Sequence, residues 1–168
     1  MKLILVRHAD AVAKGENGST RDFDRPLTDQ GREQAKKLAD TLAAHGVKPN
    51  AVVTSPLVRA VQTAEPLLAL LTDSPHQPVA CSFLAPDYYR PKKLSKFLNG
   101  LGGEVLCVVG HNPPLSEYAA WLLGAYEGAV ELEKGAACLI AFEEGVEKGG
   151  GKLGWMITPA WFMAEAVV

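Results

Sequence analysis

Short apolar runs alternate along the chain with polar, glycine-bearing stretches and with longer amphipathic segments. A short apolar run that contains β-branched residues is typical of a strand buried on both faces of a sheet. The last two runs are joined by a segment whose tip is Gly149-Gly-Gly151, which is typical of a hairpin. Strands are therefore predicted at Leu3 to Val6, Ala51 to Thr54, Val79 to Phe83, Val105 to Val109, Ala136 to Phe142 and Leu153 to Ile157.

The amphipathic segments between these strands predict helices. Thr28 can cap the first helix and His45-Gly46 closes it, while apolar residues at helical spacing form one of its faces. A second helix is predicted to begin at Ser55-Pro56, with the serine as its cap, and Pro66 ends or kinks it. Further helices are predicted from about Lys92 to Leu98 and from Pro113-Pro114 onward, with Gly124 just past the end of the latter.

This alternation predicts the α/β class, with a mostly parallel central sheet and an antiparallel edge. The chain has the length of one ordinary domain and shows neither a repeat nor a linker, so a single domain over residues 1–168 is expected. A net charge of −2 and a pI near 6.1 give no basic field, which disfavours nucleic acid as a partner.

The apolar runs are too short for a secretory leader or a membrane span, so no membrane association is expected. Three cysteines lie far apart in the sequence and lack the paired spacing of a zinc site or a disulfide framework. We expect them to be buried, reduced thiols in a cytoplasmic protein. They are Cys81, Cys107 and Cys138.

Candidate chemistry lies where three of the predicted strands end. Arg7 and His8 follow the first strand, Arg59 lies in the first turn of the helix after the second, and His111 follows the fourth. Ligands of open α/β sheets bind at the carboxyl ends of the strands, so these side chains are expected to converge. For each of them the alternative is a structural role, as a solvated strand end, a surface arginine or a core histidine.

Two guanidiniums and two imidazoles without a carboxylate cluster make a poor metal site but a good phosphoryl site, so neither metal nor cofactor is expected. The chain has no Gly-rich lysine loop and no Gly-x-Ser-x-Gly elbow, which argues against nucleotide-dependent kinases and acyl transfer. A neutral imidazole can attack phosphorus, and His8 at a rigid strand end is the candidate nucleophile. His111 would donate to the phosphoryl oxygens, and Arg7 and Arg59 would clamp them.

These motifs resemble the histidine phosphatase superfamily, which has the phosphoglycerate-mutase-like fold, and in particular its small SixA-type phosphohistidine phosphatases. The resemblance implies a three-layer α/β/α fold and runs from the first strand to about Gly124. One departure is Ala9, where the family usually has glycine, which affects the fine geometry of the site rather than the class. The matching segments are Arg7-His8, Arg25-Pro-Leu-Thr28, Ser55-Pro-Leu-Val-Arg-Ala-Val-Gln-Thr63 and Val109-Gly-His-Asn-Pro113.

By this resemblance His8 becomes the phosphoenzyme and Arg7, Arg59 and His111 form the phosphate pocket. Arg25 would be a further pocket arginine, although Arg21 lies in the same loop and could serve instead. The substrate implied is a protein that carries phosphohistidine, or a small phosphoramidate.

Larger members of the family use a glutamate as general acid, and near the corresponding place this chain offers only Asp87, which is either a catalytic acid or an ordinary loop aspartate. Without an acid, ester hydrolysis should be slow, whereas the nitrogen of a phosphoramidate can be protonated before it leaves. The first hypothesis is therefore a phosphohistidine phosphatase. The alternatives are a small-molecule phosphomonoesterase and a catalytically silent module that binds phosphate or phosphoprotein, while a mutase is disfavoured by the short chain.

Overall fold

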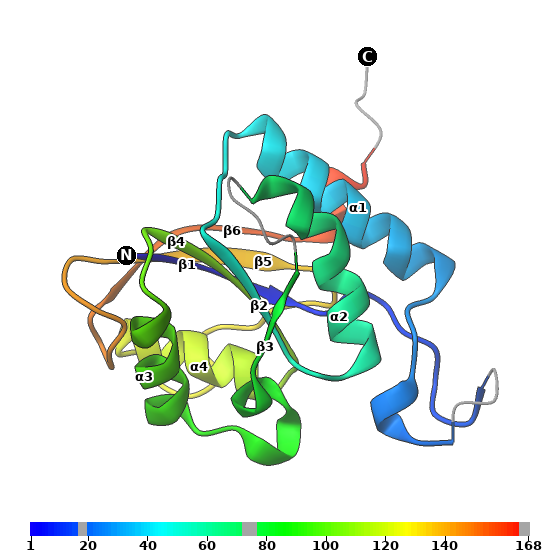
Figure 1. The fold of residues 1–168 in the computed structure, drawn as a ribbon, viewed down its shortest axis with the longest axis horizontal. Helices are drawn as coiled ribbons and strands as arrows, with labels where there is room; N and C mark the ends of the chain where they lie inside the picture. Colours follow the sequence, from blue (N-terminus) through cyan, green and yellow to red (C-terminus); the bar gives the residue numbers. More distant parts are fainter. Residues whose placement is uncertain (17–19, 72–76, 165–168) are drawn as a thin grey trace.

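The computed structural model describes residues 1–16, 20–71 and 77–164, which form a six-stranded sheet with helices on both faces (Figure 1). The strand order is β3-β2-β4-β1-β5-β6. The first four strands run parallel, and β5 and β6 are antiparallel to their neighbours. The predicted mostly parallel sheet with an antiparallel edge is thus confirmed. The strands are β1 (Lys2–Arg7), β2 (Ala51–Thr54), β3 (Val79–Ala80), β4 (Val105–Gly110), β5 (Ala137–Phe142) and β6 (Gly151–Ile157).

The helices alternate with the strands as the amphipathic pattern predicts. Thr28 caps α1 by accepting a hydrogen bond from the backbone of Gly31, and Gly46 beyond its end has a φ of +69°. Gly124 ends α4 in the left-handed conformation. The α-helices are α1 (Asp29–Ala44), α2 (Val58–Ala64), α3 (Pro91–Leu101), α4 (Pro114–Leu123) and α5 (Pro159–Phe162), and 3-10 turns occur at η2 (Asp22–Asp24), η3 (Glu65–Leu70), η4 (Ser82–Leu84) and η5 (Pro86–Tyr88).

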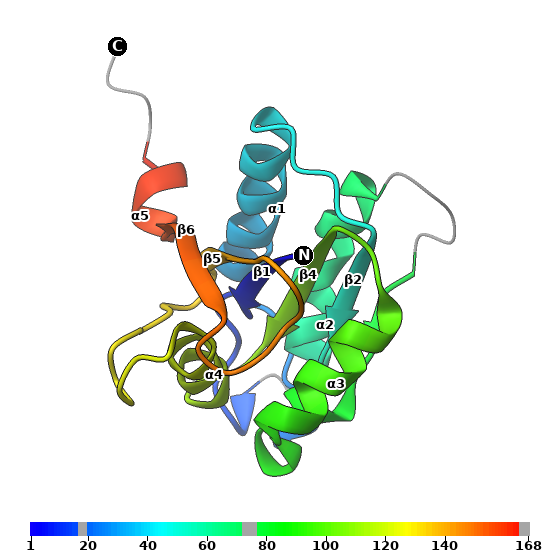
Figure 2. The same cartoon turned by 90° about the vertical axis from the view of Figure 1, so that its left-hand side faces the viewer.

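The central strand β1 divides the core into two layers, because successive side chains of a strand point to opposite faces. Leu3 and Leu5 pack into the cluster that includes α3 and α4, whereas Ile4 and Val6 pack into the cluster that includes α1 and α2. Figure 2 shows these helix pairs on opposite sides of the sheet. Each fully buried aliphatic side chain contributes about 1.5–3 kcal/mol, so β1 holds the residues that follow it rigidly.

The strand predicted from Val79 to Phe83 is wrong beyond Ala80, because the chain turns into the 3-10 helix η4. Cys81 and Leu84 are both buried in the same core cluster. Residues three apart share one side of a 3-10 turn, whereas a strand would place them on opposite faces. The packing of this pair against the core therefore ends the strand.

The second helix begins at Val58, not at Ser55-Pro56 as predicted, and no side chain caps it. The backbone N–H of Ser55 donates to the carbonyl of Val109, so the chain still pairs with β4 at this point and extends the sheet by one residue. Arg59 remains in the first helical turn, as predicted.

All three cysteines are free and buried, in agreement with the expectation of reduced thiols. Among the residues that the structure describes, no helix has the length and apolar character needed to cross a membrane.

Candidate active site

His8 and His111 meet at the carboxyl edge of the sheet. They follow β1 and β4, which are parallel neighbours whose last residues, Arg7 and Gly110, lie side by side. The imidazole ring centroids are 5.0 Å apart, and both side chains are buried. The predicted convergence of these two histidines is therefore observed.

The hydrogen bonds of His8 assign its tautomer. Its Nδ1 lies 2.8 Å from the carbonyl oxygen of Ala9, an acceptor, so Nδ1 carries the proton. Its Nε2 accepts a hydrogen bond from Nε of Arg59 at 3.3 Å. The unprotonated nitrogen of His8 thus faces a guanidinium.

Arg59 is buried, and its guanidinium also donates to the backbone and to the side chain of Asp22. Nη1 donates to the backbone oxygen of Asp22 at 2.7 Å, and Nη2 donates to its carboxylate at 3.0 Å. The other carboxylate oxygen of Asp22 accepts from Arg25 at 2.7 Å. Partial burial raises the pKa of Asp22, but the hydrogen bonds from Arg25 and Arg59 outweigh it and hold the pKa below its usual range. Asp22 is therefore an ionised neighbour of the site.

The structure distinguishes Arg21 from Arg25, which the sequence alone does not. Arg25 is one-fifth exposed and donates to Asp22 and to the carbonyl of Val12. It therefore contacts His8 indirectly, through Asp22 and Arg59. Arg21 is three-quarters exposed and pairs with Asp24 at 2.6 Å. Of the two, Arg25 is the one joined to Arg59 through Asp22.

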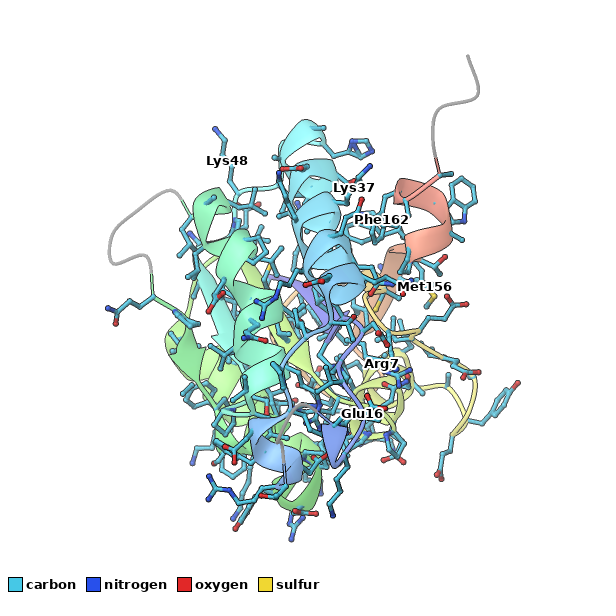
Figure 3. The ribbon with its side chains drawn as sticks, turned by 90° about the vertical axis from the view of Figure 1, so that its right-hand side faces the viewer. Arg7, Glu16, Lys37, Lys48, Met156 and Phe162 are labelled. Carbon is cyan, nitrogen blue, oxygen red and sulfur yellow. The ribbon has the colours of Figure 1, made fainter. Side chains whose placement is uncertain are left out.

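Arg7 extends from the end of β1 toward the loop that follows α4, where Nη1 donates to the carbonyl of Leu132 at 2.9 Å (Figure 3). The side-chain amide of Asn112 donates to the same carbonyl at 2.8 Å. Nε of Arg7 and Nδ1 of His111 are buried and make no hydrogen bond within the described residues. Both groups therefore keep a hydrogen-bonding capacity that the described residues do not use.

Burial and positive charge keep both imidazoles neutral. The pKa of His8 falls to about 4, chiefly through burial, with a smaller lowering from the cations Arg59, Arg7 and Lys134 and an opposing effect of the hydrogen bond to the Ala9 carbonyl. The pKa of His111 falls to about 2, chiefly through burial and then through His8 and Arg59. At neutral pH the site carries arginine charges and neutral imidazoles, which suits an oxyanion.

Sequence reasoning missed two contributors. Ser55, interpreted as a helix cap, places its hydroxyl 2.8 Å from Nε2 of His111. The sequence does indicate a role for Asp22, because its spacing of three residues from Arg25 permits an ion pair. Arg21 and Asp24 have the same spacing, however, so the spacing alone does not identify the pair at the site. Only the fold shows which pair meets Arg59.

Ala9, the departure from the usual family glycine, is fully buried. Its backbone N–H donates to Oγ1 of Thr63 at 3.1 Å, and its methyl group packs with Ala11, Leu27 and Ala35. The added Cβ thus packs within a small apolar cluster.

Asp87 is not gathered with the histidines. It is exposed in η5 and lines a groove of about 400 Å³ that Asp22 also lines. Two exposed aromatic residues, Phe23 and Tyr88, line the same groove. Within the described residues, no group of three or more histidine, cysteine or acidic side chains is arranged to hold a metal ion.

Comparison with known proteins agrees with this geometry. The model of the histidine phosphatase superfamily (branch 1) matches residues 3–79. An uncharacterized protein of Picosynechococcus sp. is 37% identical over 125 residues, which are 71% of either chain. A 2,3-bisphosphoglycerate-dependent phosphoglycerate mutase of Corynebacterium diphtheriae is 43% identical over 63 residues, 38% of this chain and 25% of the mutase.

Among solved structures, that of the protein histidine phosphatase SixA complexed with tungstate is similar to this chain with a TM-score of 0.80 and 26% identity. The likeness covers 95% of this chain and 98% of that chain. It confirms the three-layer, phosphoglycerate-mutase-like fold and extends it to the C-terminal strands, which lie beyond the family-model match.

Proposed function

The chain belongs to the histidine phosphatase superfamily, and we propose that it is a phosphatase that hydrolyses phosphohistidine through a covalent intermediate at His8. One observation carries the proposal. Nε2 of His8 is unprotonated, because Nδ1 is held by the Ala9 carbonyl, and it lies 3.3 Å from the guanidinium of Arg59. An imidazole fixed in this way keeps an unprotonated nitrogen, and its lone pair can attack phosphorus once the oxyanion takes over the hydrogen bond from Arg59.

In the first step Nε2 of His8 attacks phosphorus, so that a new N–P bond forms as the P–N bond of the substrate breaks. The electron pair of the broken bond stays on the leaving nitrogen. The leaving group departs as a neutral molecule because it is protonated before the bond breaks, and an imidazole carries this proton on its other ring nitrogen. Arg7 and Arg59 bind the equatorial oxygens, where charge is spread during transfer. Nδ1 of His111 donates to a phosphoryl oxygen, while its Nε2 accepts from Ser55.

In the second step water attacks the phosphoryl group and the His8–P bond breaks. The proton of the water passes to the released phosphate, and His8 returns to its neutral form. The first step exchanges one phosphorus–imidazole bond for another, so it lies near thermal balance when the substrate is phosphohistidine. No metal or cofactor has a part in either step, since the guanidiniums bind the charge of the oxyanion.

The carboxylates near the site support a phosphoramidate over an ester. Asp22 accepts hydrogen bonds from Arg25 and Arg59, so it is ionised and has no proton to give. An imidazole that is already protonated on its other ring nitrogen leaves as a neutral molecule and needs no acid. The groove with Asp22, Asp87, Phe23 and Tyr88 offers carboxylates to its N–H and aromatic faces to its ring. We therefore propose that this groove receives the leaving group.

Asp87 on the wall of this groove favours a second candidate, a small-molecule phosphomonoesterase in which Asp87 is the general acid. Turnover of free phosphohistidine, phosphoramidate, sugar phosphates and p-nitrophenyl phosphate by the parent and by Asp87→Asn separates the two. We expect kcat/KM for the phosphoramidates to exceed that for the sugar phosphates by about 10²-fold or more, and Asp87→Asn to lower it by no more than about threefold, since Asp87 is exposed. Faster ester hydrolysis that Asp87→Asn abolishes would establish the second candidate instead, and binding of phosphate without any turnover would indicate a silent module.

We further propose that the protein acts in the cytoplasm. Its three cysteines are free and buried, which suits a reducing compartment.

A further inference from the structure

A second groove, of about 580 Å³, runs along the outer side of α3 and contains none of the proposed catalytic residues. Figure 2 shows α3 on the face of the sheet opposite α1. The groove is lined by Phe83, Lys93, Lys96, Phe97, Gly100 and Leu101.

The floor of the groove is apolar. Phe83 and Phe97 are half-buried and pack against the core cluster beneath them, while Leu101 remains 39% exposed at one end. Gly100 leaves the surface open, since no atom lies within 4 Å of the position that a Cβ would take there. A partner could therefore place apolar side chains on this floor without moving the helix.

The rim of the groove is cationic. The α3 segment carries Lys92, Lys93 and Lys96 and contains no acidic residue. All three lysines are exposed, and none forms an ion pair within the described part of the chain. Nζ of Lys93 lies 5.9 Å from the centroid of the Phe83 ring, so the charge stands directly over the apolar floor. The complementary ligand is acidic and carries apolar side chains.

The short turn η4 lies between this groove and the groove that includes Asp22 and Asp87. Ser82 lines the groove that includes Asp22, and the next residue, Phe83, lines the groove on α3. A polypeptide whose phosphohistidine enters the site can therefore cross η4 and reach α3, whereas a small molecule would fill only the first groove.

We propose that the α3 groove is a docking surface for an acidic, amphipathic segment of the phosphoprotein substrate. The proposal rests on the proposed function and specifies it, because it makes a protein rather than a free phosphoramidate the preferred substrate. The acidic segment is the favoured occupant because its charge is complementary to the lysines of α3. An anionic membrane would meet a concave surface with few lysines, each worth only about 1 kcal/mol near a lipid surface, and is the less favoured occupant.

The test uses two helical peptides, each with one phosphohistidine at its end and leucines on one face, with either glutamates or lysines on the other face. Their kcat/KM is measured with the parent, with Lys93→Glu/Lys96→Glu, and with Lys36→Glu/Lys37→Glu. The last variant makes the same charge change at exposed positions of α1 and is the matched control. Free phosphohistidine is the substrate that needs no docking.

We expect the parent to prefer the acidic peptide about tenfold over the basic one, through a lower KM. Lys93→Glu/Lys96→Glu should abolish this preference and leave free phosphohistidine turnover unchanged, while the α1 variant should behave as the parent does. Equal turnover of the acidic peptide by the α3 variant and the parent would overturn the proposal. So would an equal loss in the α1 variant, because it would indicate a general charge effect.

Two further measurements keep the proposal separate from the function on which it rests. Fluorescence anisotropy of the unphosphorylated acidic peptide measures docking alone, and loss of binding in the α3 variant is expected even if no phosphoramidate is hydrolysed. Sedimentation with vesicles of phosphatidylserine and phosphatidylcholine tests the membrane alternative. Vesicle binding that depends on Lys93 and Lys96, with peptide kinetics unaffected, would overturn protein docking in favour of a lipid surface.

Discussion

Asp22 accepts two hydrogen bonds from the guanidinium of Arg59, one at its backbone oxygen (2.7 Å) and one at its carboxylate (3.0 Å). The same guanidinium donates to Nε2 of His8. A loop residue 37 positions upstream thus holds the arginine next to the proposed nucleophile. An oxyanion that binds Arg59 must share its donors with the carboxylate, and the negative charge of Asp22 opposes that of the phosphoryl group.

Asp22→Asn should therefore strengthen competitive inhibition by inorganic phosphate. The amide keeps the approximate shape of the side chain and removes the charge, so we expect the inhibition constant to fall about three- to tenfold, the modest size typical of a half-exposed charge. Asp24→Asn is the control, because Asp24 pairs with the exposed Arg21. Weaker phosphate binding in Asp22→Asn would show that holding Arg59 in place is the larger effect of the carboxylate.

Arg25→Ala should lower kcat/KM for a phosphoramidate about tenfold. Removing the Arg25 guanidinium leaves Asp22 with a single arginine partner, so Arg59 loses part of its support. Arg21→Ala should change kcat/KM less than about twofold, since that side chain is three-quarters exposed and pairs with Asp24. The reverse order of the two variants would assign the pocket arginine to position 21.

The lowered pKa of His8 predicts that kcat/KM does not fall between pH 7 and pH 5. Because burial lowers the pKa from 6.5 to about 4, the imidazole stays neutral as the pH falls from 7 to 5. The kcat/KM for a phosphoramidate, corrected for ionisation of the substrate, should stay nearly constant over this range. An apparent pKa near 6.5 would contradict the buried, neutral nucleophile.

The same shift has a consequence for stability. Below pH 6.5 the unfolded chain binds a proton at His8 before the folded protein does, so the free energy of unfolding should decline as the pH falls toward 4.

Two helical glycines should respond oppositely to alanine. A Cβ on Gly31 would overlap the backbone carbonyl of Asp10, where the chain leaves β1 and passes the start of α1. Gly31→Ala should therefore cost about 2 kcal/mol or more, despite the better helix propensity of alanine. Gly100→Ala meets open space in α3 and should gain about 0.5–1 kcal/mol. Urea unfolding measures both, and a stabilised Gly31→Ala would show that Asp10 can move.

The sequence alone predicts the sheet, because the apolar runs that indicate strands are local features. It also predicts the convergence of His8 and His111, because the carboxyl ends of parallel strands meet at one edge of the sheet. It does not predict Asp22 on Arg59. The loop contains two interleaved aspartate–arginine pairs with the same spacing, and only contact with a helix far along the chain distinguishes them.

Ser55 and the end of β3 show the same limit. A serine before a proline is a normal helix cap, but pairing of Ser55 with β4 delays the helix and leaves its hydroxyl for His111. Similarly, the apolar run after Val79 fits a strand until burial of Cys81 and Leu84 on one side forces a turn. In both places tertiary packing outweighs local preference.

The most direct test of the central claim is rapid-quench trapping with ³²P-labelled phosphoramidate, followed by peptide mapping of the labelled protein. We predict an acid-labile, alkali-stable phosphoryl group on Nε2 of His8 that forms within the first turnover and decays as phosphate is released. His8→Ala should remain unlabelled and inactive. Turnover by His8→Ala at the parental rate, or a label on any other residue, would contradict the mechanism.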